Sequence, residues 1–348
     1  MNPYFPQGVR LGNYQGKPVM RFTIQNKNGM VADVLNIGGI ISRLVVPCRH
    51  TGFRDVVFGF SDFLNYIPNL DHHIGSIVGR YANRIGGAAF SINGHRYALA
   101  ANEGNNILHG GKDNLSKRFW KLSDLAENKL TLTILSPDGD QGFPGDLTVR
   151  VTFTVSDDNA LVLQYEATST KPTPVCFTQH GYFNLYGSPT SVLDHYVWVD
   201  ADFITETDNE NIPTGKLLPV KDSGYDLGKP VLVKDIIRQL PSGLDNNYVL
   251  KQYQEGNYAL HKAAGLFEPE SGIWMEVFTT EPGMQVYTAN HLHKILSPYP
   301  IPPFPAICLE AQHFPDSPNK PQFPSTLLLP GQVYRQETRY CFSIKESL

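Results

Sequence analysis

The sequence has little of what marks nucleic-acid-binding, membrane or secreted proteins. Its 348 residues include 29 lysines and arginines against 33 aspartates and glutamates, a net charge of −4, with no basic run. Nucleic acids and anionic membranes attract basic patches, so neither is expected as a partner. No stretch approaches the ~18 consecutive apolar residues of a membrane span, and the first residues lack the basic and apolar regions of a signal peptide. We therefore expect a cytoplasmic protein that acts on a neutral small molecule.

Cysteine is scarce, and several catalytic signatures are missing. The 4 cysteines stand singly, without the paired spacing of zinc sites or small disulfide frameworks, so we expect free, buried thiols. The motifs HExxH, GxSxG, GxGxxG and the P-loop are absent, as are the usual signatures of zincins, α/β-hydrolases and dinucleotide-binding enzymes. Histidines at positions 72 and 73, and at 291 and 293, are not spaced like helical zinc ligands. These absences favour acid/base chemistry without metal or cofactor.

The chain contains many short segments in which apolar and polar residues alternate. Residues 147–155 alternate with a period of two, residues 156–159 (SDDN) supply a turn, and residues 161–167 alternate again, which predicts a β-hairpin. A helical turn is expected only near residues 235–240. Many strands without intervening helices predict an all-β fold, a large antiparallel β-sandwich forming a single domain over residues 1–348. Further strands are expected at residues 19–25, 31–36, 40–46, 130–135, 273–279 and 333–344.

Two distant residues are candidates for an acid/base pair. His180 lies in residues 178–185 (TQHGYFNL), among small, polar and aromatic neighbours, and histidine titrates near neutral pH. A lone histidine in a strand is more often structural, so the second residue matters. Glu310 ends an apolar run in residues 307–312 (ICLEAQ), where partial burial would tune a base. The carboxylate is expected to raise the pKa of His180 above its usual value of about 6.5, and the imidazolium to lower the pKa of Glu310 below its usual value of about 4.3.

Other polar clusters lie in glycine-rich or proline-rich segments. Asn83 and Arg84 lie in residues 79–87 (GRYANRIGG), and His109 precedes a glycine pair, so these side chains could approach a hydroxyl-rich ligand. Arg80, in the first segment, is expected to pair structurally with a carboxylate. Residues 138–145 lack the ligand spacing of a calcium loop and are expected to form a turn. Prolines crowd residues 298–305, where a stiff loop leading to the Glu310 strand is favoured over a polyproline ligand for a partner domain.

Several motifs occur in one order along most of the chain: GRYANRI (79–85), LHGG (108–111), DG with GFPG (138–145), TQH with YFNL (178–185), LEAQ (309–312) and LPG (329–331). Through these motifs and their order, the chain resembles the aldose 1-epimerases, also called galactose mutarotases, from about Gly12 to near Phe342. The resemblance implies a galactose mutarotase-like supersandwich. It also implies an isomerase that interconverts the α and β anomers of free hexoses such as glucose and galactose without metal or cofactor.

The resemblance also implies roles for individual residues. His180 would be the general acid at the ring oxygen, and Glu310 the general base at the anomeric hydroxyl. Asn246 follows the sugar-binding aspartate where the family usually has histidine; this position and residues 298–305 bear on sugar specificity. The preferred aldose and the oligomeric state are not set by the sequence. The residues expected to bind the sugar are Asn83, Arg84, His109, Asp245 and Gln285.

Three other interpretations stay open. A relative that acts on sugar phosphates should need further cationic residues for the phosphate, whereas Arg80 and Arg84 already belong to the neutral-sugar motif. A non-catalytic sugar sensor or lectin-like domain should lack the acid or the base, whereas His180 and Glu310 are both present. A purely structural sandwich would not explain why the chain carries the motifs of the aldose 1-epimerases in the same order as that family.

Overall fold

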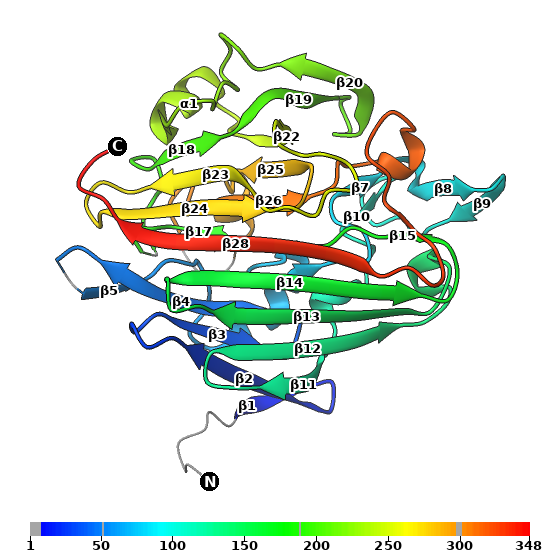
Figure 1. The fold of residues 1–348 in the computed structure, drawn as a ribbon, viewed down its shortest axis with the longest axis horizontal. Coiled ribbons are helices and arrows are strands. Elements are labelled where there is room, and N and C mark those ends of the chain that lie inside the picture. Colours follow the sequence, from blue (N-terminus) through cyan, green and yellow to red (C-terminus); the bar gives the residue numbers. More distant parts are fainter. Residues whose placement is uncertain (1–7, 51, 188, 297–300) are drawn as a thin grey trace.

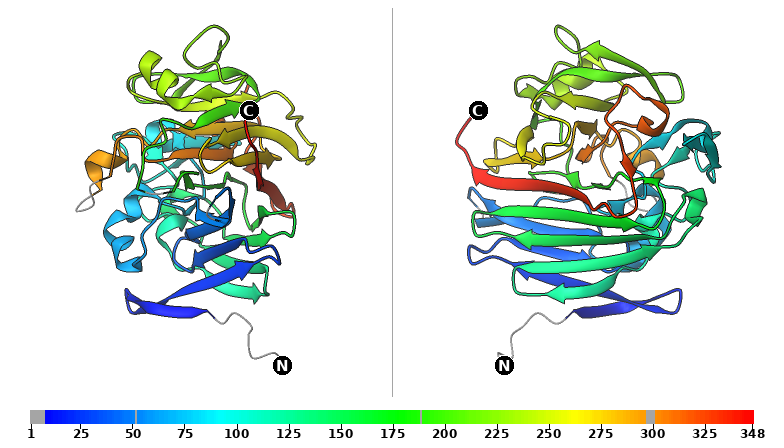
Figure 2. Two further views of the ribbon diagram at one scale, coloured as in Figure 1. Left: turned by 90° about the vertical axis from the view of Figure 1, so that its left-hand side faces the viewer. Right: turned by 45° about the vertical axis from the view of Figure 1, so that its right-hand side comes forward.

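The computed structural model describes residues 8–50, 52–187, 189–296 and 301–348. Three large antiparallel sheets form two layers: a nine-stranded sheet in front, with a five-stranded and a six-stranded sheet behind it (Figure 1). Short two-stranded ribbons and loops extend from the back layer, as the two turned views show (Figure 2). This arrangement confirms the predicted all-β sandwich.

The nine-stranded sheet contains, in spatial order, β11 (Lys121–Leu125), β12 (Lys129–Ser136), β13 (Leu147–Val155), β14 (Ala160–Ser169), β28 (Tyr334–Ile344), β24 (Ile273–Thr279), β23 (His261–Phe267), β18 (Tyr196–Val199) and β21 (Val231–Leu232). The six-stranded sheet contains β17 (Tyr182–Phe183), β26 (Ile307–Gln312), β25 (Gly283–Tyr287), β22 (Asp245–Leu250), β19 (Ala201–Thr207) and β20 (Pro213–Pro219). The five-stranded sheet contains β1 (Val9–Tyr14), β2 (Lys17–Gln25), β3 (Val31–Leu35), β4 (Ile41–Cys48) and β5 (Gly52–Asp55).

The ribbons pair β6 (Ile77–Val78) with β16 (Thr178–Gln179), β7 (Arg84–Ile85) with β10 (Ile107–Leu108), β8 (Ala89–Ile92) with β9 (His95–Ala98), and β15 (Thr173–Pro174) with β27 (Leu327–Leu328). The described helices are α1 (Val233–Gln239), α2 (Leu292–Ile295) and the 3₁₀ turns Phe63–Asn65, Ile67–His72, Gly86–Ala88, Leu115–Lys117, Asp140–Gly142 and Ser317–Asn319. None of the helices in the described part of the chain is long and apolar enough to cross a membrane.

The alternation in the sequence explains the strands and their burial. In β13 the apolar residues are buried, and the threonines and arginine between them face outward. The predicted hairpin is the β13–β14 pair, and the predicted helical turn is α1. Each of the other predicted strands is present within two residues of its expected bounds. Local side-chain patterning therefore determined most of the strand assignments.

One large apolar core lies between the layers. It joins side chains of all three sheets, such as Ile24 of the five-stranded sheet, Phe153 of the nine-stranded sheet and Leu309 of the six-stranded sheet. That residues 1–348 behave as one domain stays a prediction. Cys48, Cys176 and Cys308 are buried, and Cys341 is only partly buried. Pro298 and Pro300 lie outside the described residues, and residues 301–306 lead into β26 as irregular backbone.

Candidate active site

The floor of the candidate site is the inner part of the six-stranded sheet. Strand β26 is buried on both faces. Leu309 and its alternate neighbours face the apolar core, so Glu310 faces the opposite way. The antiparallel register aligns Glu310 with Gln285 of β25, and Gln285 with Asn247 of β22. Asp245 precedes Asn247 by two residues and shares its face. Three neighbouring strands therefore present a continuous row of polar side chains.

A separate ribbon brings His180 to this floor. The His180 N–H donates to the carbonyl of Ser76 at 2.8 Å, and the His180 carbonyl accepts from Gly75 N–H at 2.9 Å. These bonds fix the backbone on both sides of the imidazole, which stacks on Tyr182 with ring centroids 4.9 Å apart. His180 Nε2 lies 3.8 Å from Glu310 Oε2. The fold thus places two residues that are 130 positions apart in sequence side by side, buried and not hydrogen-bonded to each other.

Burial shifts the protonation of this pair in the direction opposite to the one expected from the sequence. Burial lowers the pKa of His180 to about 4. Burial raises the pKa of Glu310 well above its usual range, and Asp245 adds to that rise while Arg84 opposes it. The expectation of a raised histidine pKa and a lowered glutamate pKa was wrong, because removing both groups from water outweighs their attraction across 3.8 Å.

Asn83, Arg84 and His109 form one wall. Asn83 and His109 both have left-handed backbone, with φ of 63° and 53°. The Asn83 N–H donates to His109 Nδ1 at 3.1 Å, and Arg84 N–H donates to Asn83 Oδ1 at 2.9 Å. Gly110 follows His109 at φ 84°, and a Cβ there would lie 2.4 Å from the Gly79 carbonyl oxygen. Only glycine allows this loop to pack so closely, which explains the LHGG pattern.

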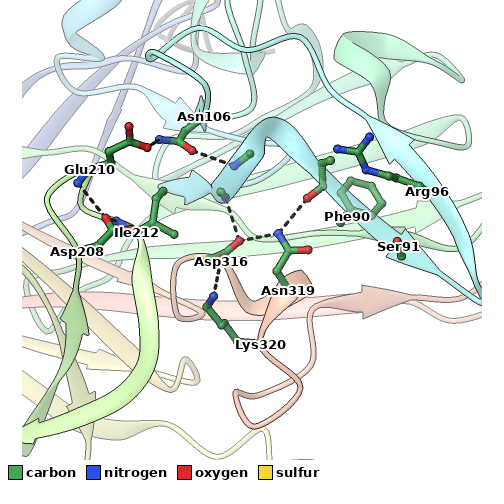
Figure 3. Close-up of a pocket in the computed structure, with 13 residues that line it drawn as sticks. Phe90, Ser91, Arg96, Asn106, Asp208, Glu210, Ile212, Asp316, Asn319 and Lys320 are labelled. Carbon is green, nitrogen blue, oxygen red and sulfur yellow. Dashed lines mark hydrogen bonds and ion pairs between the residues drawn. The ribbon is translucent and has the colours of Figure 1, made fainter.

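Arg84 is oriented by a carboxylate that the sequence did not reveal as part of the site. Its Nε and Nη2 donate to the two oxygens of Glu103 at 2.6 and 2.9 Å, a bidentate pair. Behind Arg84, the Asp316 N–H donates to the Arg84 carbonyl at 2.8 Å. Asp316 also lines a separate cavity of about 460 Å³, where its carboxylate accepts from Gly86 N–H and Asn319 (Figure 3). This network fixes the strand that carries Arg84 from its rear side.

Asp245 and Gln285 complete the group predicted from the sequence. Gln285 Nε2 donates to Asp245 Oδ1 at 2.7 Å, while Gln285 Oε1 is buried without a partner among the described residues. Asp245, at the start of β22, is exposed to solvent. Enclosure by protein still raises its pKa, and Arg84 opposes that rise. Alternation along β22 turns Asn246 to the other face, so the residue that departs from the family pattern does not join this row.

A model of the aldose 1-epimerase family matches residues 20–341. The chain belongs to this family. It is 38% identical to the galactose mutarotase of Sus scrofa over 332 residues, which cover 94% of both chains. It is 31% identical to the aldose 1-epimerase of Escherichia coli K12 over 337 residues, 94% of this chain and 96% of that one. A crystal structure of a GalM/aldose epimerase homologue from C. elegans superimposes with a TM-score of 0.85 at 29% identity, covering 94% of this chain and 99% of the other.

The structure assigns other positions of this family member differently from the sequence. Arg80 was expected to pair with a carboxylate, but its guanidinium donates to Ser136 Oγ and to the carbonyls of Ser136, Pro137 and Pro144. It holds the 136–144 turn and remains structural. Sequence reasoning also missed Glu103, Asn247 and His73. Of these, only His73 belongs to a visible sequence pattern, the histidine pair at 72–73, whose spacing does not fit helical zinc ligands.

The side chains of the site include a group that could in principle hold a metal ion. His180, Cys308 and Glu310 are the one group of potential ligands, among the residues described, whose donor atoms lie within 4.8 Å of one another. Burial raises the pKa of Glu310 and that of Cys308 well above their usual ranges. A cation would have to displace both protons, because metals bind thiolate and carboxylate. The group therefore fits proton transfer better than metal binding.

Proposed function

We propose that this chain is an aldose mutarotase, an isomerase that interconverts the α and β anomers of free hexoses such as glucose and galactose. The supporting observation is the buried pair of His180 and Glu310, whose Nε2 and Oε2 lie 3.8 Å apart without a hydrogen bond between them. Buried polar groups normally have partners. In the proposed complex the ring oxygen and the anomeric hydroxyl of the sugar bond to these two side chains.

In this mechanism Glu310 takes the proton of the anomeric hydroxyl while His180 donates a proton to the ring oxygen. The bond between C1 and the ring oxygen breaks, giving an aldehyde, a protonated Glu310 and a neutral His180. Rotation about the C1–C2 bond exposes the other carbonyl face, and closure reverses both transfers. No proton or electron is consumed. Burial favours the neutral forms of both side chains, which are the forms present after ring opening. Each transfer contributes roughly 10²–10⁴-fold.

The proposed binding residues hold the sugar in a fixed position relative to His180 and Glu310. Asn83, Arg84 and His109 lie on one wall, and Asp245 and Gln285 lie on the floor. Arg84 uses Nε and Nη2 on Glu103, which leaves Nη1 for a sugar oxygen. Because Glu103 already neutralises this arginine, the site favours an uncharged aldose over a sugar phosphate. Correct placement of the reacting atoms is worth as much as the proton transfers themselves.

Polarimetry tests the proposal directly. Freshly dissolved α-glucose, α-galactose and a pentose should each reach anomeric equilibrium faster with the purified protein, and a chelator should not change the rate. Activity that disappears with the chelator would contradict the metal-free mechanism. Sugar binding without any acceleration would favour a sugar sensor instead.

A further inference from the structure

His73 is a third histidine of the cleft that the proposed mechanism does not use. Its ring centroid lies 4.7 Å from that of His109 and 6.1 Å from that of His180. Its backbone is left-handed, with φ 53° and ψ 25°. Residues other than glycine adopt this conformation at a cost and concentrate at functional sites. Asn83 and His109 share this conformation, and the contact with the His109 ring places His73 beside the wall that they form.

A chain of hydrogen bonds determines which nitrogen of His73 carries the proton. The Asn114 amide donates to the Gly111 carbonyl at 2.8 Å, so its Oδ1 is free to accept. Ser116 Oγ donates its single proton to this Oδ1 at 2.5 Å. Ser116 Oγ can then only accept from His73 Nδ1, 2.7 Å away. His73 Nδ1 therefore bears the hydrogen, and Nε2 carries a lone pair.

His109 has the opposite polarity. Its Nδ1 accepts from Asn83 N–H, so its Nε2 bears the hydrogen. Burial and the neighbouring histidines lower the pKa of both His73 and His109 well below the usual range, so both rings are neutral. No described residue hydrogen-bonds Nε2 of either ring, and neither nitrogen is among the buried atoms that lack a partner. One fixed acceptor and one fixed donor thus remain available to a ligand.

The backbone keeps His73 in register with the reacting pair. Gly75 and Ser76, which follow His73, bond to the carbonyl and N–H of His180 at 2.9 and 2.8 Å. The Ser76 N–H donates to the His73 carbonyl at 3.0 Å. His73 cannot shift along the cleft without moving His180. A group held by His73 therefore has a fixed position relative to the reacting atoms.

We propose that His73 and His109 together recognise one hydroxyl of the aldose, which donates its proton to His73 Nε2 and accepts from His109 Nε2–H. This rests on the proposed function, which supplies an aldose in the cleft. A hydroxyl satisfies both rings, whereas a hydrogen or a methyl ether at that carbon leaves His73 unpaired. His73 is thus a specificity residue for one position of the sugar ring.

The kinetic test uses His73→Phe, with His72→Phe as the matched control, on the best aldose substrate and its series of monodeoxy and monofluoro analogues. A fluorine accepts but cannot donate, so it removes only the contact to His73. We expect His73→Phe to lower kcat/KM roughly three- to tenfold on the parent sugar, the size of one neutral hydrogen bond. The loss should disappear for the deoxy and fluoro analogues of one ring position and persist for all others. His72→Phe should match wild type.

A loss of equal size on every analogue would show a structural role only and would overturn the proposal, as would unchanged kinetics. ¹⁵N NMR of the wild-type imidazoles provides a test that needs neither turnover nor a variant. We expect hydrogen on Nδ1 of His73 and on Nε2 of His109, with both Nε2 signals shifting when the aldose is added. The opposite tautomer or an unshifted His73 signal would refute the assignment. A wild-type protein that binds aldoses with these shifts yet accelerates none would refute the mutarotase function and leave the recognition pair standing.

Discussion

Two histidine–glutamate pairs lie near strands β25 and β26, one buried and one with a partly buried histidine, and they differ in how fully their atoms are bonded. His313 Nδ1 lies 2.6 Å from Glu281 Oε2, at hydrogen-bond distance. His180 Nε2 lies 3.8 Å from Glu310 Oε2, and each residue keeps a buried polar atom without a partner among the described residues. The same two residue types thus make a satisfied contact in one place and an incomplete one in the other.

The difference is the one expected between a structural pair and the proposed reactive pair. A satisfied buried pair stabilises the fold and has no free hydrogen-bonding capacity. An unsatisfied pair costs stability and is retained where a ligand completes it. The sequence contains no signal for this distinction, because His313 and Glu310 are only three residues apart in one segment.

The largest effect should come from breaking the reactive pair. Glu310→Gln and His180→Asn should each lower kcat by roughly 10²–10⁴-fold, because each removes one proton transfer. Glu281→Gln and His313→Asn, the same changes in the other pair, should leave kcat near wild type. Polarimetry with circular dichroism as the folding control measures this. Near-normal turnover in Glu310→Gln or His180→Asn would disprove the acid/base assignment.

A smaller loss of activity should follow from removing Arg84, the positively charged residue beside Asn83 and His109. Arg84→Ala should raise KM and lower kcat together, with kcat/KM falling roughly 10- to 100-fold, the size of one charge-assisted hydrogen bond. Arg43→Ala is the matched control, because Arg43 also pairs with a carboxylate, that of Asp33, but on another sheet. Unchanged kinetics in Arg84→Ala would exclude that residue from the sugar site.

The pH profile should show the effect of burial on the reactive pair. The pair works with one proton. A second proton binds as the pH falls through the His180 pKa of about 4, and the last proton leaves as the pH rises through the raised Glu310 pKa. The profile of kcat/KM should be bell-shaped and fall about tenfold per pH unit beyond each limb. An acidic limb near the ordinary histidine pKa of about 6.5 would contradict the burial effect.

The smallest effect should be on stability, and only in the satisfied pair. Glu281→Ala should lower the free energy of unfolding by about 1–3 kcal/mol, because it leaves the buried side of His313 without its acceptor. Glu310→Gln should lose nothing, since burial already disfavours the charged carboxylate at that position. Urea unfolding of both variants beside the wild type measures this. Equal destabilisation of both variants would erase the distinction between the pairs.

Much of the fold could be read from side-chain alternation. Strands β13 and β24 match their predicted bounds at both ends, because apolar residues on every second position can be buried on only one face. Short ribbons such as β6–β16 were missed, because two residues are too few to show a period. That ribbon fixes His180, so the element that matters most to the site had the weakest sequence signal.

By itself the sequence supplied candidate residues for acid/base chemistry and sugar binding, and the family motifs suggested their roles. The tertiary structure determined the protonation and the hydrogen-bond partners of these residues. The pKa directions of His180 and Glu310 depend on how much water the fold excludes around them, and the expectation made without that knowledge had the wrong sign. The bidentate Glu103 partner of Arg84 and the tautomer of His73 depend on contacts between segments that are distant in the chain. Distance, burial and hydrogen-bond direction are properties of the folded chain, because each is set by neighbours that the order of residues does not specify.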